Sequence, residues 1–243
     1  MGTGITILII FVASIAASFI QRVSGFGFGI FIMTILPLIM PSYGEATALS
    51  GLLAMVNSWY ICIMMWRHIP WRKLLPILVT FIVVSFFAIR TVAGIDSRLL
   101  KHVLGVILIV VSVYFFFISE RIKVRPTMPV QLTMGTAAGL MGGFFAMQGP
   151  PAVLYFVACT ETKEEYLAIT QAFFAFGNLM MTFFRASNGF VTRAVGIGWL
   201  CGIAGVAIGI WLGAKVFNTL KLSTLRKVIY AYMAVSGVVA LLA

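Results

Sequence analysis

The chain contains two long apolar segments that glycine and proline interrupt at matching places. The first interruption is the stretch 21–29, Gln-Arg-Val-Ser-Gly-Phe-Gly-Phe-Gly, and the second runs from Gly139 to Pro151. Neither stretch continues a helix cheaply, because glycine costs backbone entropy and proline lacks an N–H group. In hydrocarbon, an unpartnered backbone polar group costs several kcal/mol. Such breaks are therefore tolerated only where they are buried in protein or line a cavity, and paired breaks in two halves are typical of a transport site.

The composition indicates a membrane protein along the whole chain. Of the 243 residues, 62% are hydrophobic and 9% are charged, and the mean hydropathy is +1.10. A soluble domain has about 25% charged residues. The net charge of +11 lies mostly in short loops between apolar runs, which is the orienting pattern of membrane proteins. We therefore expect an all-α polytopic protein in the lipid bilayer of the plasma membrane, with no nucleic-acid partner.

We expect about eight transmembrane segments in two repeats, 1–126 and 127–243. The predicted segments are 3–40, 44–65, 74–93 and 100–118, followed by 128–160, 166–187, 194–216 and 223–243. The first segment of each repeat is broken, at 22–29 and at 148–151. As one straight helix, the first segment would exceed about 50 Å, against a hydrocarbon core of about 30 Å. It must therefore tilt, protrude or fold back as a hairpin.

The distribution of basic residues favours the hairpin alternative. If each broken segment crosses the membrane once, eight basic residues lie on each side. If both segments fold back, eleven lie on the side of the loops 67–73 and 121–125, and five lie on the other side. Because basic loops stay in the cytoplasm, the second arrangement is preferred. It makes the repeats inverted and places both ends of the chain outside the cell.

The first break carries the polar residues Gln21, Arg22 and Ser24. A charge deep in an apolar segment is costly, so Arg22 is a candidate for attracting an anion. Alternatively, it reaches the headgroups or lies at a hairpin tip. Glycine allows close approach of a ligand or a second backbone, and the break contains three: Gly25, Gly27 and Gly29.

The second break offers Gln148 at the equivalent place, immediately before Gly149, Pro150 and Pro151. Helix N-termini after the two breaks would direct amide groups and positive dipole ends toward a small oxyanion. Alternatively, the prolines form a kink that serves packing alone. Three further amides lie inside apolar segments and either bind the substrate or link helices; they are Asn57, Gln171 and Asn178.

No carboxylate lies at the centre of an apolar run, because all six acidic residues are at segment ends or in loops. The cysteines and histidines form no group with ligand spacing. We therefore expect no catalytic residue, metal or cofactor, and no proton relay by a buried acid. Moving one negative charge outward through 100 mV yields about 2.3 kcal/mol, which could drive export without a partner ion.

The two breaks and their surroundings resemble the sulfite exporter TauE/SafE family. The matching pieces are Gly25 to Gly29 with Pro37, Ala46 to Leu49 with Asn57, and Gly139 to Pro151 with Asn178. The family pattern often has Gly-Gly-Gly or Gly-Gly-Pro at the breaks, whereas phenylalanines separate the glycines of the first break here. The resemblance covers nearly the whole chain.

The resemblance implies a plasma-membrane permease that exports sulfite, sulfonate or related organosulfur anions. Two alternatives are an anion uptake permease and a membrane-embedded scaffold or assembly subunit without transport. A membrane-embedded enzyme is disfavoured, because no nucleophile lies beside a base in the sequence.

Overall fold

The computed structural model describes residues 3–114, 117, 125–216, 238 and 241, and their regular structure is helical throughout. The helices of the first half are α1 (Thr3–Ser24), α2 (Phe28–Ile32), α3 (Leu36–Ile39), α4 (Tyr43–Met64), η1 (Trp66–His68), α5 (Trp71–Val92) and α6 (Ser97–Val113). Those of the second half are α7 (Met128–Phe145), α8 (Gly149–Cys159), α9 (Lys163–Ser187) and α10 (Arg193–Val216).

Five helices in the described ranges are long and apolar enough to cross a membrane: α1, α4, α5, α9 and α10. Residues 28–39 and α8 form shorter apolar helices. The predicted all-α, multi-span class is therefore confirmed. The count of eight segments stays a prediction, because the last expected segment, 223–243, lies almost wholly outside the described residues.

Side-chain caps fix where the central helices begin. Ser42 Oγ accepts a hydrogen bond from the Glu45 N–H group at 3.2 Å before α4, and Thr162 Oγ1 accepts one from the Glu165 N–H group at 3.1 Å before α9. These bonds satisfy N–H groups that the first turn of a helix leaves without a partner. The two central helices thus start from the same local pattern, one in each half.

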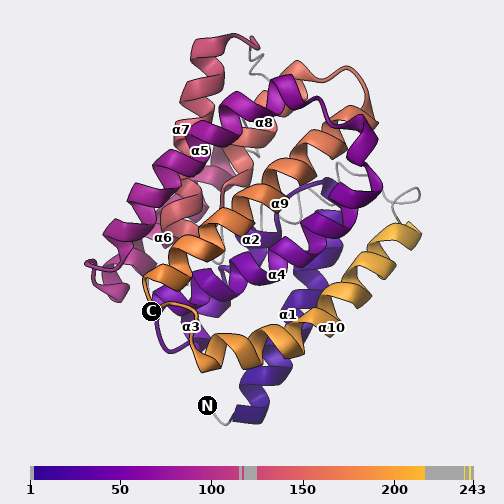
Figure 1. Ribbon diagram of the computed structural model, residues 1–243. Coiled ribbons are helices and arrows are strands. Elements are labelled where there is room, and N and C mark those ends of the chain that lie inside the picture. Colours follow the sequence, from indigo (N-terminus) through magenta and orange to yellow (C-terminus); the bar gives the residue numbers. More distant parts are fainter. Residues whose placement is uncertain (1–2, 115–116, 118–124, 217–237, 239–240, 242–243) are drawn as a thin grey trace.

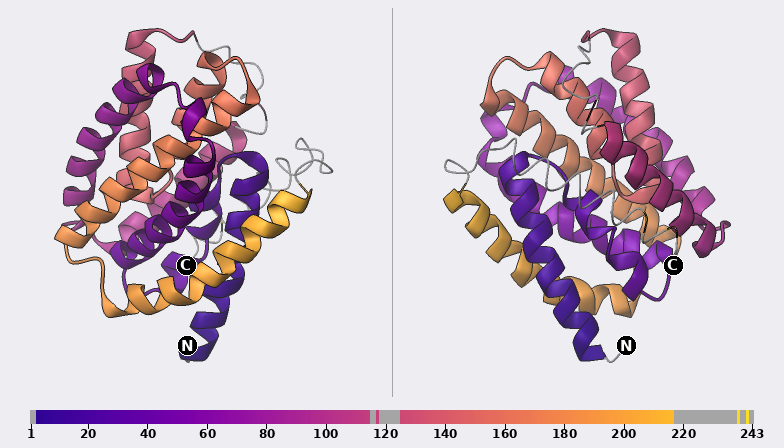
Figure 2. Two further views of the ribbon diagram at one scale, coloured as in Figure 1. Left: turned by 45° about the vertical axis from the view of Figure 1, so that its right-hand side comes forward. Right: turned by 180° about the vertical axis from the view of Figure 1, so that it is seen from behind.

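The helices follow one order across the bundle: α7, α5, α9, α4, α10 and α1 each pack against the next. Figures 1 and 2 show α4 and α9 in the middle, with the α5–α7 pair on one side and the α1–α10 pair on the other. α4 and α9 run antiparallel, since Ser58 lies at the level of Gln171 whereas Gly51 lies beside Arg185. Each outer pair therefore joins a broken helix of one half to a long helix of the other.

Both outer pairs pack closely along rows of glycine. A Cβ atom at Gly205 or Gly209 of α10 would collide with a carbonyl oxygen of α1. On α7, three glycines spaced by four residues face α5, where an added Cβ atom would crowd side-chain or backbone atoms; they are Gly135, Gly139 and Gly143. Small residues at this spacing allow helix backbones to approach closely in membranes. In both pairs, residues later in one helix contact residues later in the other, so the two helices of each pair run parallel.

The broken segments both fold back to the end from which they came. The Lys73 carbonyl oxygen accepts a hydrogen bond at 2.7 Å from Gln131, near the start of α7. The Lys73 ammonium group donates at 2.8 Å to the Cys159 carbonyl oxygen, at the end of α8. In the other half, Gly198 lies against Ile10 near the start of α1 and against Leu49 near the start of α4. The chain path is thus that of the hairpin alternative.

We expect Gly209→Ala to destabilise the protein and Gly196→Ala to leave it unchanged or slightly more stable. Both residues are on α10, but a Cβ atom at Gly209 would overlap the Ile15 carbonyl oxygen, whereas nothing lies within 4 Å of one at Gly196. Overpacking costs about 1–3 kcal/mol, and alanine gains up to about 1 kcal/mol over glycine in a helix. Thermal unfolding in detergent measures both; equal effects would contradict close packing of α1 on α10.

Candidate functional site

The first break is formed by glycines in left-handed backbone conformations. α1 ends at Ser24, Gly25 has φ 84° and Gly27 has φ 104°, and α2 begins at Phe28. Residues other than glycine rarely adopt such angles without strain. The predicted break at 22–29 is thus confirmed and narrowed to 25–27.

The second break lies a few residues earlier than predicted. α7 ends at Phe145, Ala146 has φ 55°, and α8 already begins at Gly149. Pro150 and Pro151 therefore form the first turn of α8 and do not interrupt a helix. Proline suits this place because the first turn lacks acceptors for its N–H groups. The break predicted at 148–151 is accordingly corrected to 146–148.

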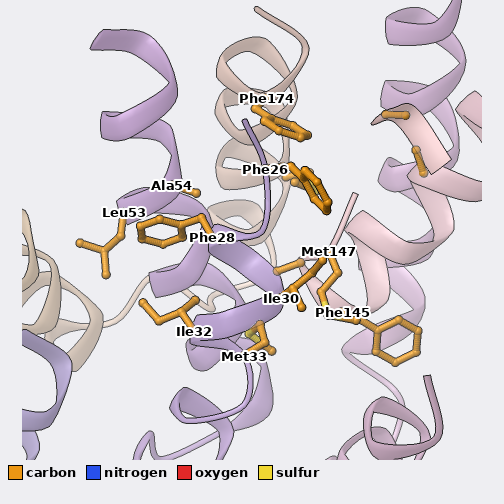
Figure 3. Close-up of a cluster of buried hydrophobic side chains, with 14 of the residues drawn as sticks. Phe26, Phe28, Ile30, Ile32, Met33, Leu53, Ala54, Phe145, Met147 and Phe174 are labelled. Carbon is orange, nitrogen blue, oxygen red and sulfur yellow. The ribbon is translucent and has the colours of Figure 1, made fainter. Parts of the chain in front are cut away.

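The two breaks meet in the middle of the bundle. Gly29 lies so close to the second break that a Cβ atom there would collide with the Ala146 carbonyl oxygen. Figure 3 shows Ile30 of α2 beside Met147 of the second break, with Phe28 turned toward Ala54 of α4. Apolar side chains thus seal the region around the contact.

A small cavity lies where the breaks meet, with about 20 Å³ open to a water-sized sphere, which is room for about one water molecule. Three buried amides contribute its polar lining: Gln21 of α1, Gln148 of the second break and Asn178 of α9. Gly27, Gly29 and Gly149 also line it. Both halves of the chain therefore contribute to one cavity.

Gln171 of α9 supports the first break through its amide group. Its Nε2 atom donates to the Gly25 carbonyl oxygen at 2.7 Å, and its Oε1 atom accepts from Gln21 Nε2 at 3.0 Å. Gln21 Nε2 also lies 3.0 Å from Ser58 Oγ of α4. This network links three helices and satisfies a carbonyl group that the break frees.

The remaining predicted amides differ in their partners. Gln148 Nε2 donates to Asn178 Oδ1 at 2.9 Å, so the amide of the second break is held by α9 as well. Asn57 of α4 is fully buried, and neither its Nδ2 nor its Oδ1 atom has a hydrogen-bond partner. An unsatisfied buried amide is costly, and the amide of Asn57 therefore has both a donor and an acceptor available to a ligand or water.

Several predicted residues lie outside the cavity lining. Arg22 has its Cβ and Cγ atoms against Gly213 of α10. The Ser24 hydroxyl group turns back to the carbonyl oxygens of Ile20 and Phe26, at 2.7 and 2.6 Å. Pro150 and Pro151 are buried in α8 beside the lining residue Gly149.

A buried cation on the same helix as the site amides was not predicted from the sequence. Arg185 is 1% exposed, and its Nη2 atom donates to the Gly142 carbonyl oxygen of α7 at 2.8 Å. It follows Gln171 and Asn178 at intervals of seven residues, which places all three on one face of α9. This seven-residue spacing is the feature of the sequence from which Arg185 could have been placed beside the site amides.

With the site described, comparison with known proteins identifies the family. The sulfite exporter TauE/SafE family model matches residues 10–240. The chain belongs to this family. A curated relative from Cupriavidus necator, named probable sulfite/organosulfonate exporter TauE, is 22% identical over 222 residues, covering 90% of this chain and 87% of that protein. No solved structure matches. The resemblance seen in the sequence is thus confirmed.

We expect Gln171→Met to destabilise the protein and Asn57→Leu to leave it equally stable or more stable. The first change removes the partner of the Gly25 carbonyl oxygen, a loss of about 1–3 kcal/mol. The second replaces a buried amide that has no partner. Thermal unfolding in detergent compares them. If Asn57→Leu proves the more destabilising, the assignment of hydrogen bonds here is wrong.

Proposed function

We propose that this TauE/SafE family member exports sulfite, sulfonate or a related organosulfur anion across the plasma membrane, through the cavity between the two breaks. The observation that carries the proposal is the convergence of one break from each half on a single polar cavity. Paired breaks near the middle of a membrane protein are where transporters of this kind bind their substrates. The name of the Cupriavidus necator relative supports the same substrate class.

The chemistry of the lining suits a small anion. An anion leaving water loses its hydration, so fixed donors must replace it. Gln148 and Asn178 supply neutral amide donors, whereas the two N–H groups of Gln21 are already donated to Ser58 and Gln171. No acidic residue lines this cavity. Gly149 allows close approach, although Pro150 and Pro151 reduce the free N–H groups of the first turn of α8. The side chains therefore carry more of the binding than the helix terminus does.

Both alternatives predict different behaviour from the same site. An uptake permease would use the cavity in the opposite direction. A scaffold subunit would have no use for an unpartnered buried amide such as Asn57, which is costly unless a ligand or water engages it. The unpartnered amide of Asn57 therefore favours transport over a purely structural role.

We further propose that 1–126 and 127–243 are inverted repeats. Exchanging α1 with α7, α4 with α9 and α5 with α10 reverses the helix order across the bundle and leaves every neighbouring pair intact. The equivalent helices α4 and α9 run antiparallel, which is the relation that inversion requires. In the hairpin arrangement predicted from the sequence, eleven basic residues lie on the side of the 67–73 loop, which makes that side cytoplasmic by the positive-inside rule.

Cysteine labelling from the two sides of the membrane tests this arrangement. In a background without the native cysteines, Arg72→Cys and Glu161→Cys should react only from the cytoplasm, and Ser97→Cys and Ser187→Cys only from outside. All four residues are exposed. Labelling of positions 72 and 161 from opposite sides would show that the second broken segment crosses the membrane once.

The function predicts electrogenic flux that depends on the cavity amides. In proteoliposomes with an imposed potassium-diffusion potential, sulfite flux should follow the potential, because 100 mV acts on one charge with about 2.3 kcal/mol. Gln148→Met should reduce flux roughly tenfold or more, since a hydrogen bond to a charged group contributes about 1.5–3 kcal/mol. pH and sodium are matched across the membrane.

The matched control is Gln131→Met, which changes a buried amide on α7 that bonds to Lys73 outside the cavity. Its flux should stay near that of the unmodified protein once stability is accounted for. Equal loss in both variants would remove the cavity from the proposal. Flux that ignores the potential but follows a proton gradient would instead show a coupled carrier.

A further inference from the structure

The guanidinium group of Arg185 points into the bundle, although the residue lies near a helix end from which its side chain could reach water. It lies two residues before the end of α9, where long basic side chains ordinarily extend to the membrane surface. Instead the residue is 1% exposed, and Nη2 donates to the Gly142 carbonyl oxygen. Its orientation therefore needs a reason beyond anchoring the helix end.

No carboxylate neutralises this cation in the described part of the chain. Five of the six acidic residues lie there, and the one ion pair among the described residues joins Lys73 to Glu165. Glu45, in the first turn of α4 near the same end of the bundle, makes no ion pair with Arg185. A buried charge without a partner is costly, so a mobile anion is the natural counter-ion.

The guanidinium has an unused donor next to a space that a glycine leaves open. Arg185 Nη1 is buried without a hydrogen-bond partner, and so is the Thr182 hydroxyl oxygen. A Cβ atom at Gly51 of α4 would lie 3.1 Å from Nη1 and 3.6 Å from Thr182 Oγ1. The Tyr43 hydroxyl, also buried without a partner, lies within electrostatic range of the guanidinium. The two N–H groups of Nη1 and the Thr182 hydroxyl thus face one spot, and the Tyr43 hydroxyl interacts with the same guanidinium.

We propose that Arg185, Thr182 and Tyr43 bind the SO₃ group of the transported anion at a second binding site, between the central cavity and the outer end of the bundle. The inference rests on the proposed function, because it assigns the charged residue that the exported anion meets after the amides. Arg185 lies seven residues beyond Asn178 on α9, about 10 Å along the helix. Sulfite and sulfonates both present three oxygens, which match three donors.

The sharpest test compares Thr182→Val with Thr170→Val. Both hydroxyl oxygens are buried on α9 without a partner, but only Thr182 lies at Gly51 and Arg185. Thr182→Val should raise the half-saturating sulfite concentration for flux roughly tenfold, the effect of one hydrogen bond to a charged group. Thr170→Val should not change it. Methanesulfonate should give the same contrast if the SO₃ group is what is recognised.

Further variants separate binding from folding. Gly51→Ala keeps all three donors but fills the space beside Nη1, so it should weaken the anion's effect while the protein still folds. Arg185→Gln removes the charge and should abolish the rise in unfolding temperature that sulfite produces in the unmodified protein. Tyr60→Phe, at an exposed position of α4, is the control for Tyr43→Phe.

The outcomes distinguish this inference from the proposed function. If the unmodified protein moves sulfite, and Thr182→Val, Gly51→Ala and Tyr43→Phe lower only the unfolding temperature and leave its half-saturating concentration unchanged, Arg185 is a structural brace and the inference is overturned. If the unmodified protein neither moves nor binds sulfite or methanesulfonate, both proposals fail together. Anion-dependent stabilisation that disappears in Arg185→Gln but persists in Gln148→Met supports a second binding site separate from the cavity.

Discussion

The hydrogen bond from the Gln171 amide to the Gly25 carbonyl oxygen is the interaction on which the site depends. A helix that stops inside a bundle leaves backbone groups without partners, and in an apolar interior each is costly. Gln171 supplies one partner and at the same time orders Gln21, which lines the cavity. At the second break, Gln148 is held in the same manner by Asn178. α9 therefore acts as the polar support for both breaks.

Close glycine packing is what allows two hairpins to fit into so small a bundle. α1 and α7 each turn back after their break, and the space between them must also hold α2 and α8. The glycine rows of α10 and α7 bring the helix backbones into near contact, so the outer pairs are thin. The Gly29 backbone then reaches the carbonyl group of Ala146, and the two halves touch at their breaks.

The local pattern of the sequence predicted the two breaks and the class of fold, because glycine and proline act over a few positions. The second break was predicted a few residues too late, because Gly-Pro-Pro can either end a helix or begin one. Here it begins α8, and the left-handed residue that follows the end of α7 is Ala146. The local pattern also emphasised Arg22, whose stem packs on Gly213, and overlooked Arg185. Depth along a segment is visible in a sequence, but the direction in which an arginine turns depends on the neighbouring helices.

The division between neutral amides at the centre and a cation near one end has an electrostatic consequence for the proposed export. A transport site must bind strongly enough to admit an anion and weakly enough to release it. A guanidinium inside the central cavity would hold the anion too firmly, because no carboxylate lines the cavity to offset it. Two opposite unit charges about 10 Å apart, at an effective dielectric constant of 20, attract each other by about 1.7 kcal/mol. That is close to the work of a 100 mV potential on one charge, about 2.3 kcal/mol, so the fixed charge and the membrane potential would draw the anion in the same direction.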